Sequence, residues 1–197
     1  YMRCIPNMIV TAPMDEEELR NLMYTAQQDD MGPFSIRYPR GNGVMPNWKL
    51  PMKALKIGKG RKIADGVDVA ILTIGHIGNE VSRALHLLSE EGINPAHYDM
   101  RFLKPIDEDM LHEVFSKFKK VITVEDGCIQ GGMGTAVLEF MADNRYSATV
   151  VRLGIPDRFV EHGDQNELWA ECGYDAASVV AEVKKLSVKM IAGSIAS

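Results

Sequence analysis

The sequence predicts an α/β protein with a mostly parallel sheet flanked by helices. Near-continuous apolar runs, such as Val67–Ile74 and Val121–Val124, have the pattern of strands that are buried on both faces. Between these runs lie segments such as Val81–Leu88, whose apolar residues recur with helical spacing. Strands that alternate with helices in this way are typical of a parallel sheet with helices packed on it.

Composition and charge narrow the class of protein. The chain has 197 residues, of which 46% are hydrophobic and 25% charged, as in ordinary globular proteins. It has 22 basic and 27 acidic residues and no polybasic block, so we expect neither nucleic acid nor a membrane surface as a partner. No apolar run is long enough to cross a bilayer. The three separated cysteines, Cys4, Cys128 and Cys172, are expected to be buried reduced thiols of a cytoplasmic protein.

The first part of the chain predicts an incomplete βαβ unit. Met8–Ala12 is an apolar strand, and Asp15 then caps a helix whose predicted inner face consists of Leu19, Leu22, Met23 and Ala26. Phe34–Tyr38 is the second strand and should run parallel to the first. Such a unit is too small for a domain, so we expect further strands upstream of Tyr1. We also expect its open edges to be covered, either by domain pairing or by contacts with a crystal partner.

The stretch Arg37-Tyr38-Pro39-Arg40-Gly41-Asn42 follows this second strand. Pro39 has no amide donor and should end the strand. Arg40 then lies at the carboxyl end of a strand, where open α/β sheets bind their ligands. The alternative is that Arg37 and Arg40 pair with surface carboxylates at the edge of the sheet.

A linker and a second, larger unit follow. Residues 43–55 have no clear period and predict an exposed linker, and residues 55–63 predict an edge strand or irregular hairpin. Further strands are predicted at Val67–Ile74, Ala96–Phe102, Val121–Val124 and Ala148–Leu153, each followed by a helical pattern. The final Val188–Ser197 is small and uncapped and is predicted to fray.

Two features at the carboxyl end of one strand suggest chemistry. Gly131-Gly132-Met133-Gly134 precedes a helix, where exposed amides can bind a phosphate, but it does not complete a known phosphate-binding pattern. We therefore favour the interpretation that these glycines allow the helix to pack closely on the sheet. Glu125 and Asp126 are adjacent on a strand and should point to opposite faces, which favours a capping and interface role over a catalytic pair.

Two histidines lie in loops that commonly carry functional side chains. His76 follows a strand and precedes a helix, and His162 lies in the loop 157–163. Neither has a partner that the sequence identifies, so the roles of His76, His162 and Glu125 stay open. The chain carries no self-contained catalytic constellation.

Several motifs together resemble a known family. In order along the chain they are Tyr1-Met2-Arg3-Cys4-Ile5-Pro6, the stretch Arg37–Asn42, Asp99-Met100-Arg101-Phe102-Leu103-Lys104-Pro105, Val124-Glu125-Asp126 and Gly131–Gly134. They resemble the C-terminal third of the 1-deoxy-D-xylulose-5-phosphate synthases, thiamine-diphosphate enzymes of the transketolase superfamily. The first two stretches are similar to this synthase family in particular, and the others recur loosely in related C-terminal domains.

The resemblance implies a division of the chain and an activity for the full-length enzyme. Residues 1–42 would be the end of a pyrimidine-binding domain, 43–55 a linker, 56–186 a transketolase-like C-terminal domain and 187–197 a tail. Enzymes of the family decarboxylate pyruvate on thiamine diphosphate with Mg²⁺. They then add the two-carbon unit to D-glyceraldehyde 3-phosphate, which supplies a precursor of isoprenoids, thiamine and pyridoxal phosphate.

The resemblance also implies site residues. Arg40 matches the family position that contacts the phosphate of glyceraldehyde 3-phosphate, and Arg37 is either a second phosphate contact or structural. The family's catalytic glutamate, active-site histidines and metal ligands would lie upstream of Tyr1. We therefore expect no catalytic residue, cofactor contact or metal ligand here, and no activity of the segment alone, whose role would be domain packing and homodimerisation. The alternatives are the β-type subunit of a 2-oxoacid dehydrogenase E1 component and a non-catalytic binding module.

Overall fold

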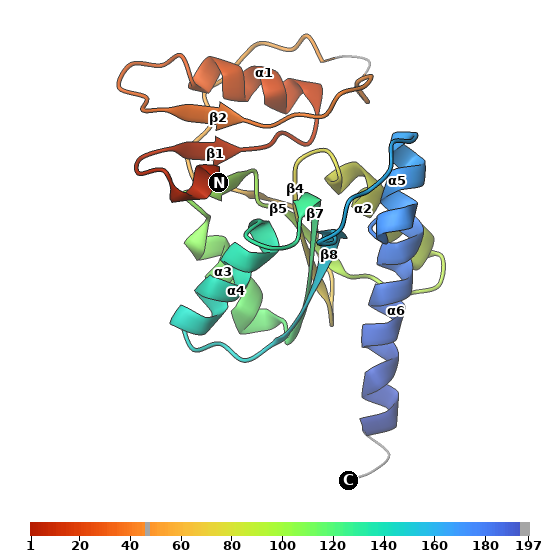
Figure 1. The fold of residues 1–197 in the computed structure, drawn as a ribbon. Helices are drawn as coiled ribbons and strands as arrows, with labels where there is room; N and C mark the ends of the chain where they lie inside the picture. Colours follow the sequence, from red (N-terminus) through yellow and green to blue (C-terminus); the bar gives the residue numbers. More distant parts are fainter. Residues whose placement is uncertain (46–47, 194–197) are drawn as a thin grey trace.

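The larger part of the fold is a five-stranded sheet with the strand order β3-β5-β4-β7-β8 (Figure 1). A computed structural model describes residues 1–45 and 48–193. The strands are β3 (Arg61–Ala64), β4 (Ala70–Ile74), β5 (Ala96–Asp99), β7 (Lys120–Cys128) and β8 (Thr149–Ile155). All neighbours are parallel except β3, which pairs antiparallel with β5 at the edge. This confirms the predicted α/β class. The edge strand predicted within residues 55–63 is confirmed only at its end, since β3 begins at Arg61.

Helices cover both faces of this sheet. The helices are α2 (Gly78–Ser89), α3 (Glu108–Lys117), α4 (Met133–Asp143), α5 (Gln165–Cys172) and α6 (Ala176–Gly193). One apolar core joins β4 and β5 to α3 and α4, and a second joins β4 and β7 to α2, α5 and α6. Every residue of β4 is buried, as the continuous apolar run predicted.

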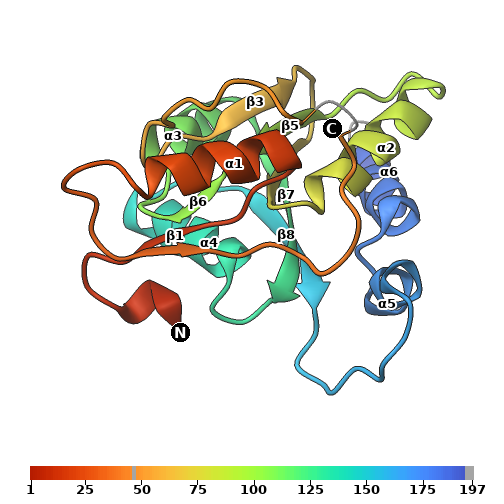
Figure 2. The same ribbon diagram turned by 90° about the horizontal axis from the view of Figure 1, so that it is seen from above.

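A second, three-stranded sheet has the order β2-β1-β6. Strands β1 (Ile9–Thr11) and β2 (Phe34–Ile36) are parallel and are connected by α1 (Glu16–Thr25), which confirms the predicted βαβ unit. A short 3-10 helix, η1 (Met2–Cys4), precedes it. This unit lies beyond one end of the larger sheet in Figure 1, and Figure 2 looks down on it.

The predicted strand Ala96–Phe102 is wrong, because the chain turns inside it. Strand β5 ends at Asp99, and β6 (Phe102–Lys104) crosses over to pair antiparallel with β1. At the turn, Arg101 has a left-handed backbone with φ 55°, and its amide donates to the Asp99 carboxylate at 3.1 Å. The C-terminal unit thus contributes a strand that covers an edge of the first unit, which is the domain pairing that we expected.

The buried face of α1 differs from the predicted one. Asp15 caps the helix as predicted, since its carboxylate accepts from the Glu18 amide. Met23, however, is 52% exposed, and the buried residues of the helix are Glu18, Asn21, Leu22 and Thr25. The face is partly polar because it makes hydrogen bonds. Asn21 and Thr25 accept from the backbone of residues 53 and 55, which holds part of the predicted linker along α1.

Two further expectations concern the cysteines and the C-terminus. All three cysteines are free, but Cys4 and Cys128 are exposed, which is contrary to the expected burial. Cys4 ends a 3-10 helix that has no buried residue, and Cys128 lies beyond an irregularity in the β7–β8 pairing.

Helix α6 continues to Gly193 and so replaces most of the predicted frayed tail, whose last four residues lie outside the described ranges. Within those ranges, we find no helix with the length and apolarity that crossing a membrane requires.

Candidate functional site

A cavity of about 370 Å³ lies where the two units meet. Its wall is formed by segments that follow the carboxyl ends of β1, β2 and β4, together with α5. The lining residues are Pro13, Met14, Asp15, Glu16, Leu19, Tyr38, Pro39, Arg40, Gly41, Asn42, Gly43, Val44, His76, Asn79, Glu80, Gln165 and Trp169. Parallel strands of α/β folds present their ligands at this end, so the topology marks the cavity as the candidate site.

Arg40 lines this cavity and has no carboxylate partner in the part of the chain that the structure describes. Among the described residues, its guanidinium has no ion-pair or hydrogen-bond partner, while Arg37 pairs with Asp126. The lining acids, in contrast, are engaged: Glu16 accepts from the amides of residues 44 and 45 and Glu80 from Arg83, while Asp15 caps α1. An unpaired guanidinium in a cavity is suited to a bidentate contact with an anion such as a phosphate.

Arg37 has a different environment from Arg40. Its Nη2 atom lies 3.5 Å from Oδ2 of Asp126, and Arg37 does not line the cavity of Arg40. It lines a second, open hollow of about 530 Å³ that Arg40 also borders. Of the two arginines that the sequence offered as phosphate contacts, the structure therefore brings only Arg40 into the first cavity.

His76 lies in the cavity wall, and its ring contacts residues from other elements. Its Nε2 atom lies 3.4 Å from Oδ2 of Asp126 and 3.4 Å from Nε2 of Gln165, and its ring packs on Trp169. Burial lowers the pKa of His76, while Asp126 opposes this and Arg37 adds to it. The imidazole is therefore biased toward its neutral form.

His162 is exposed and lines neither hollow, so the structure does not bring it to the site.

The glycine-rich stretch before α4 is occupied by a side chain of the protein itself. The Glu125 carboxylate accepts from the amides of Met133 and Gly134, both at 2.8 Å. A Cβ atom at Gly132 would lie 2.0 Å from Oε2 of Glu125, so close packing requires glycine there. This confirms the capping role predicted for Glu125 and the packing interpretation of the glycines, because an anion at this helix end would have to displace the carboxylate.

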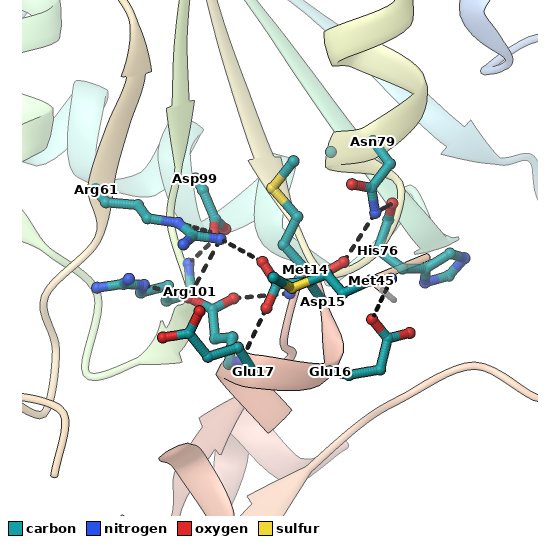
Figure 3. A network of polar contacts seen from close by, with 12 residues as sticks. Met14, Asp15, Glu16, Glu17, Met45, Arg61, His76, Asn79, Asp99 and Arg101 are labelled. Carbon is teal, nitrogen blue, oxygen red and sulfur yellow. Dashed lines mark hydrogen bonds and ion pairs between the residues drawn. The ribbon is translucent and has the colours of Figure 1, made fainter. Parts of the chain in front are cut away.

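A buried charge network joins the two units beside the cavity (Figure 3). Arg61 Nε lies 3.1 Å from Asp99 Oδ2, and Arg61 Nη2 lies 3.4 Å from Asp15 Oδ2. Arg101 pairs with Glu18, whose second oxygen accepts from the Met14 amide at 2.7 Å. On the other side of Met14, the amide of Asn79 donates to the Met14 carbonyl oxygen at 2.8 Å. These contacts hold the segment after β1 in the cavity wall.

The described residues show two features that bear on a metal or diphosphate site. They contain no group of three or more His, Cys, Asp or Glu side chains that could hold a metal ion. The helix N-terminus that could take a diphosphate is occupied by Glu125. The N-terminus of α4 is therefore not open to a diphosphate unless Glu125 moves away.

Comparison with known proteins identifies the family. The model of the transketolase C-terminal domain matches residues 58–179, and that of the transketolase pyrimidine-binding domain matches residues 1–45. The chain belongs to the transketolase family. A solved split-gene transketolase, described as an inactive beta4 tetramer, is similar to it with a TM-score of 0.78 and 32% identity, over 94% of this chain and 59% of that one.

Its relatives include 1-deoxy-D-xylulose-5-phosphate synthases. That of Cytophaga hutchinsonii is 69% identical over 95% of this chain and 30% of its own length. That of Bacteroides thetaiotaomicron is 55% identical over 94% of this chain and 29% of its own length. The chain thus spans about 30% of the length of such curated relatives. The resemblance to this synthase family is confirmed, and the E1 β-type alternative is not favoured.

Several site residues were not found from the sequence. Asn79, Gln165 and Trp169 lie in the cavity wall, and Tyr174 donates to Asp126, yet none of them belongs to a motif. Asn79 belongs to α2, whereas the other three residues lie in or just after α5, far from Asn79 in the chain, so only the fold shows that they meet. A signal was present for Arg101 and Asp99, since the motif that contains them carried the resemblance, but the pattern does not show that they join the two units.

Proposed function

We propose that this chain is the C-terminal portion of a synthase that condenses pyruvate with D-glyceraldehyde 3-phosphate to 1-deoxy-D-xylulose 5-phosphate and CO₂. The identity of 69% to a named synthase supports the family activity, and the unpaired Arg40 in the cavity between the units supports the phosphorylated substrate. The single observation that carries the substrate assignment is this guanidinium, which has the charge and fork geometry that a phosphate dianion requires.

The chain spans about 30% of the length of the synthases that it resembles, so most of such an enzyme lies outside this segment. We propose that thiamine diphosphate and Mg²⁺, which supply the carbanion chemistry in this family, are bound by a more N-terminal part of the enzyme. Residues 1–42 would then complete a pyrimidine-binding domain, residues 56–186 would form the C-terminal domain, and the enzyme would act as a cytoplasmic homodimer. That the 197-residue segment alone binds no cofactor and has no activity stays a prediction.

We propose distinct roles for the two arginines. Arg40 contacts the phosphate of the aldehyde. Arg37 is paired with Asp126 and holds in place the segment of residues 37–41, called the strip below, which carries Arg40. In a full-length enzyme that contains this segment, Arg40→Ala should raise the KM for D-glyceraldehyde 3-phosphate by about tenfold to a hundredfold, as expected for the loss of a charge-assisted contact. Steady-state assays with each substrate varied in turn measure this effect.

The KM for pyruvate is the internal control, because pyruvate carries no phosphate. It should change less than about twofold in the Arg40→Ala enzyme. Arg145→Ala is a matched control, since Arg145 is exposed, does not line the cavity and should leave both constants unchanged. Equal losses for the two substrates in Arg40→Ala, or no loss, would contradict the proposed contact.

A further inference from the structure

The Asp126 carboxylate joins three segments of the chain behind the cavity. Its Oδ1 atom accepts from the Tyr174 hydroxyl at 2.8 Å, and its Oδ2 atom faces Arg37 Nη2 at 3.5 Å and His76 Nε2 at 3.4 Å. Its side chain is only 14% exposed. These partners come from the end of β2, the start of α2 and the loop between α5 and α6. Asp126 itself belongs to β7, so its contact with Arg37 crosses from one unit to the other.

Asp126 holds one end of the strip that carries Arg40. The Arg37 amide donates to the Thr11 carbonyl oxygen at 2.9 Å. This hydrogen bond is the last backbone contact that continues the β1–β2 pairing. In the described structure, no backbone amide of residues 38–43 donates a hydrogen bond, and the next anchor is Glu16, which accepts from Val44 at 2.7 Å. Between these anchors, the position of Arg40 depends on how firmly each end is held.

The charges around Asp126 also separate the two arginines. Asp126 pairs with Arg37, which lines the second hollow, whereas Arg40 is exposed, borders both hollows and has no ion-pair partner among the described residues. Without this carboxylate, Arg37 loses its partner and the strip loses its side-chain anchor at that end. A displacement of about 1 Å at a binding group is enough to cost a large factor in rate.

We propose that Asp126 is a positioning residue for the aldehyde phosphate: through Arg37, it fixes the strip of residues 37–41 so that Arg40 faces the cavity. The C-terminal domain thereby takes part in recognition of the phosphorylated substrate, although Asp126 does not itself contact the phosphate. This inference rests on the proposed function, because it assumes that Arg40 binds the phosphate.

The test compares a phosphorylated with an unphosphorylated acceptor in a full-length enzyme that contains this segment. Asp126→Asn keeps an acceptor for Tyr174 but removes the charge that holds Arg37. It should lower kcat/KM for D-glyceraldehyde 3-phosphate about tenfold and change kcat/KM for D-glyceraldehyde less than about twofold. Asp126→Glu, which restores the charge, should recover most of the loss. A merely structural role would lower both values together, and that result, or no loss at all, overturns the proposal.

Matched variants show that the effect passes through Arg37. Asp157→Asn removes an exposed carboxylate that has no ion-pair partner in the described structure, and it should leave both acceptors unaffected. Arg37→Gln acts on the exposed partner of the pair, should reproduce the Asp126→Asn effect, and tests the inference even if Asp126→Asn fails to fold. The double variant should lose no more than either single one, because both changes remove the same contact. Additive losses overturn the inference.

Arg40→Ala distinguishes a failure of the proposed phosphate contact from a failure of the positioning role of Asp126. If this variant also loses its preference for the phosphorylated aldehyde, the proposed phosphate contact holds, and the Asp126 result then decides the inference alone. If Arg40→Ala keeps the full preference, the proposed function of Arg40 fails. The positioning role of Asp126 is then overturned with it, whatever Asp126→Asn does.

Discussion

Arg37 and Arg40 carry the same charge three residues apart, yet their surroundings give them different tasks. Arg37 is about half exposed and faces Asp126 at 3.5 Å. An exposed ion pair of this kind adds only about 0–1 kcal/mol to stability, so its value lies in orientation. Arg40 has no partner among the described residues and keeps its charge available to a ligand. Residue type alone cannot distinguish the two, whereas the neighbouring carboxylate does.

Glu125 shows how a single side chain can occupy what looks like a ligand site. Glu125→Ala would leave the buried amides of Met133 and Gly134 without their acceptor. Buried donors without a partner cost about 1–3 kcal/mol, so we expect the free energy of unfolding of the 197-residue chain to fall by that amount. Urea titration followed by circular dichroism measures it.

The matched control for this change is an exposed glutamate. Glu90→Ala removes a carboxylate that is 66% exposed, and it should change the free energy of unfolding by less than about 0.5 kcal/mol. If Glu125→Ala is no more destabilising than Glu90→Ala, then the Glu125 carboxylate does not cap α4 in solution and the glycine-rich stretch is open to another anion.

At the scale of elements, β6 and the charge network beside it join the two units. Strand β6 leaves the C-terminal unit and pairs with β1, and Arg101 just before it pairs with Glu18 of α1. The network contains three carboxylates, those of Asp15, Glu18 and Asp99, but only two guanidinium groups. One negative charge is therefore in excess inside the protein, which favours a proton on the most deeply buried carboxyl group.

The excess negative charge makes the free energy of unfolding depend on pH through Asp99. Burial and the nearby Glu18 carboxylate raise the pKa of Asp99 above its ordinary value of 3.8, against the opposing effect of Arg61. Above about pH 4 the unfolded chain has released this proton while the folded chain retains it, so stability should fall as the pH rises toward the raised folded pKa. The slope contributed by one such group is at most about 1.4 kcal/mol per pH unit.

The variant that tests this is Asp99→Asn, which mimics the protonated carboxyl group. In urea titrations at several pH values, its free energy of unfolding should depend less on pH than that of the wild type. At neutral pH it should be at least as stable. A wild-type stability that rises over the same range, or a variant that is equally destabilised at every pH, contradicts the raised pKa of Asp99.

The elements that the sequence predicts well are those that one local pattern determines. The apolar run of β4 and the cap at Asp15 depend on neighbours within a few residues, and the structure has them as expected. The end of β5 depends instead on the left-handed turn at Arg101 and on pairing with a strand almost a hundred residues away. Met23 was misplaced for a similar reason, since α1 buries a polar face against another segment.

The candidate site shows the same limit. The position of Arg40 after a strand raised the hypothesis of a ligand contact, because ligands bind at the carboxyl ends of parallel strands. From the residues alone, pairing with surface carboxylates was the favoured interpretation, and the resemblance to the synthase family changed this preference. His76 was noticed but had no partner in the sequence, and its contacts with Asp126, Gln165 and Trp169 come from two other elements, β7 and α5. Single residues can be selected from their local surroundings, but their assembly requires the packing of both units.

At the scale of the whole molecule, the cavity belongs to neither unit alone. Segments after β1 and β2 form one wall, and the start of α2 together with α5 forms the other. The carboxyl ends of β4 and β7 also face the first unit, since Ile74 and Glu125 share a small hollow with Thr11. Phosphate recognition at Arg40 would therefore depend on how the two units are held together, which is the task of β6 and the buried charge network.

The most direct measurement is a structure of the full-length enzyme with a non-reactive phosphorylated analogue of the aldehyde. We predict that the phosphate lies in the cavity between the units, with its oxygens about 2.7–2.9 Å from the Arg40 guanidinium. We also predict that Arg37 remains paired with Asp126. A phosphate bound elsewhere, or an Arg40 side chain paired with a carboxylate of the enzyme while the analogue is bound, would contradict the central claim.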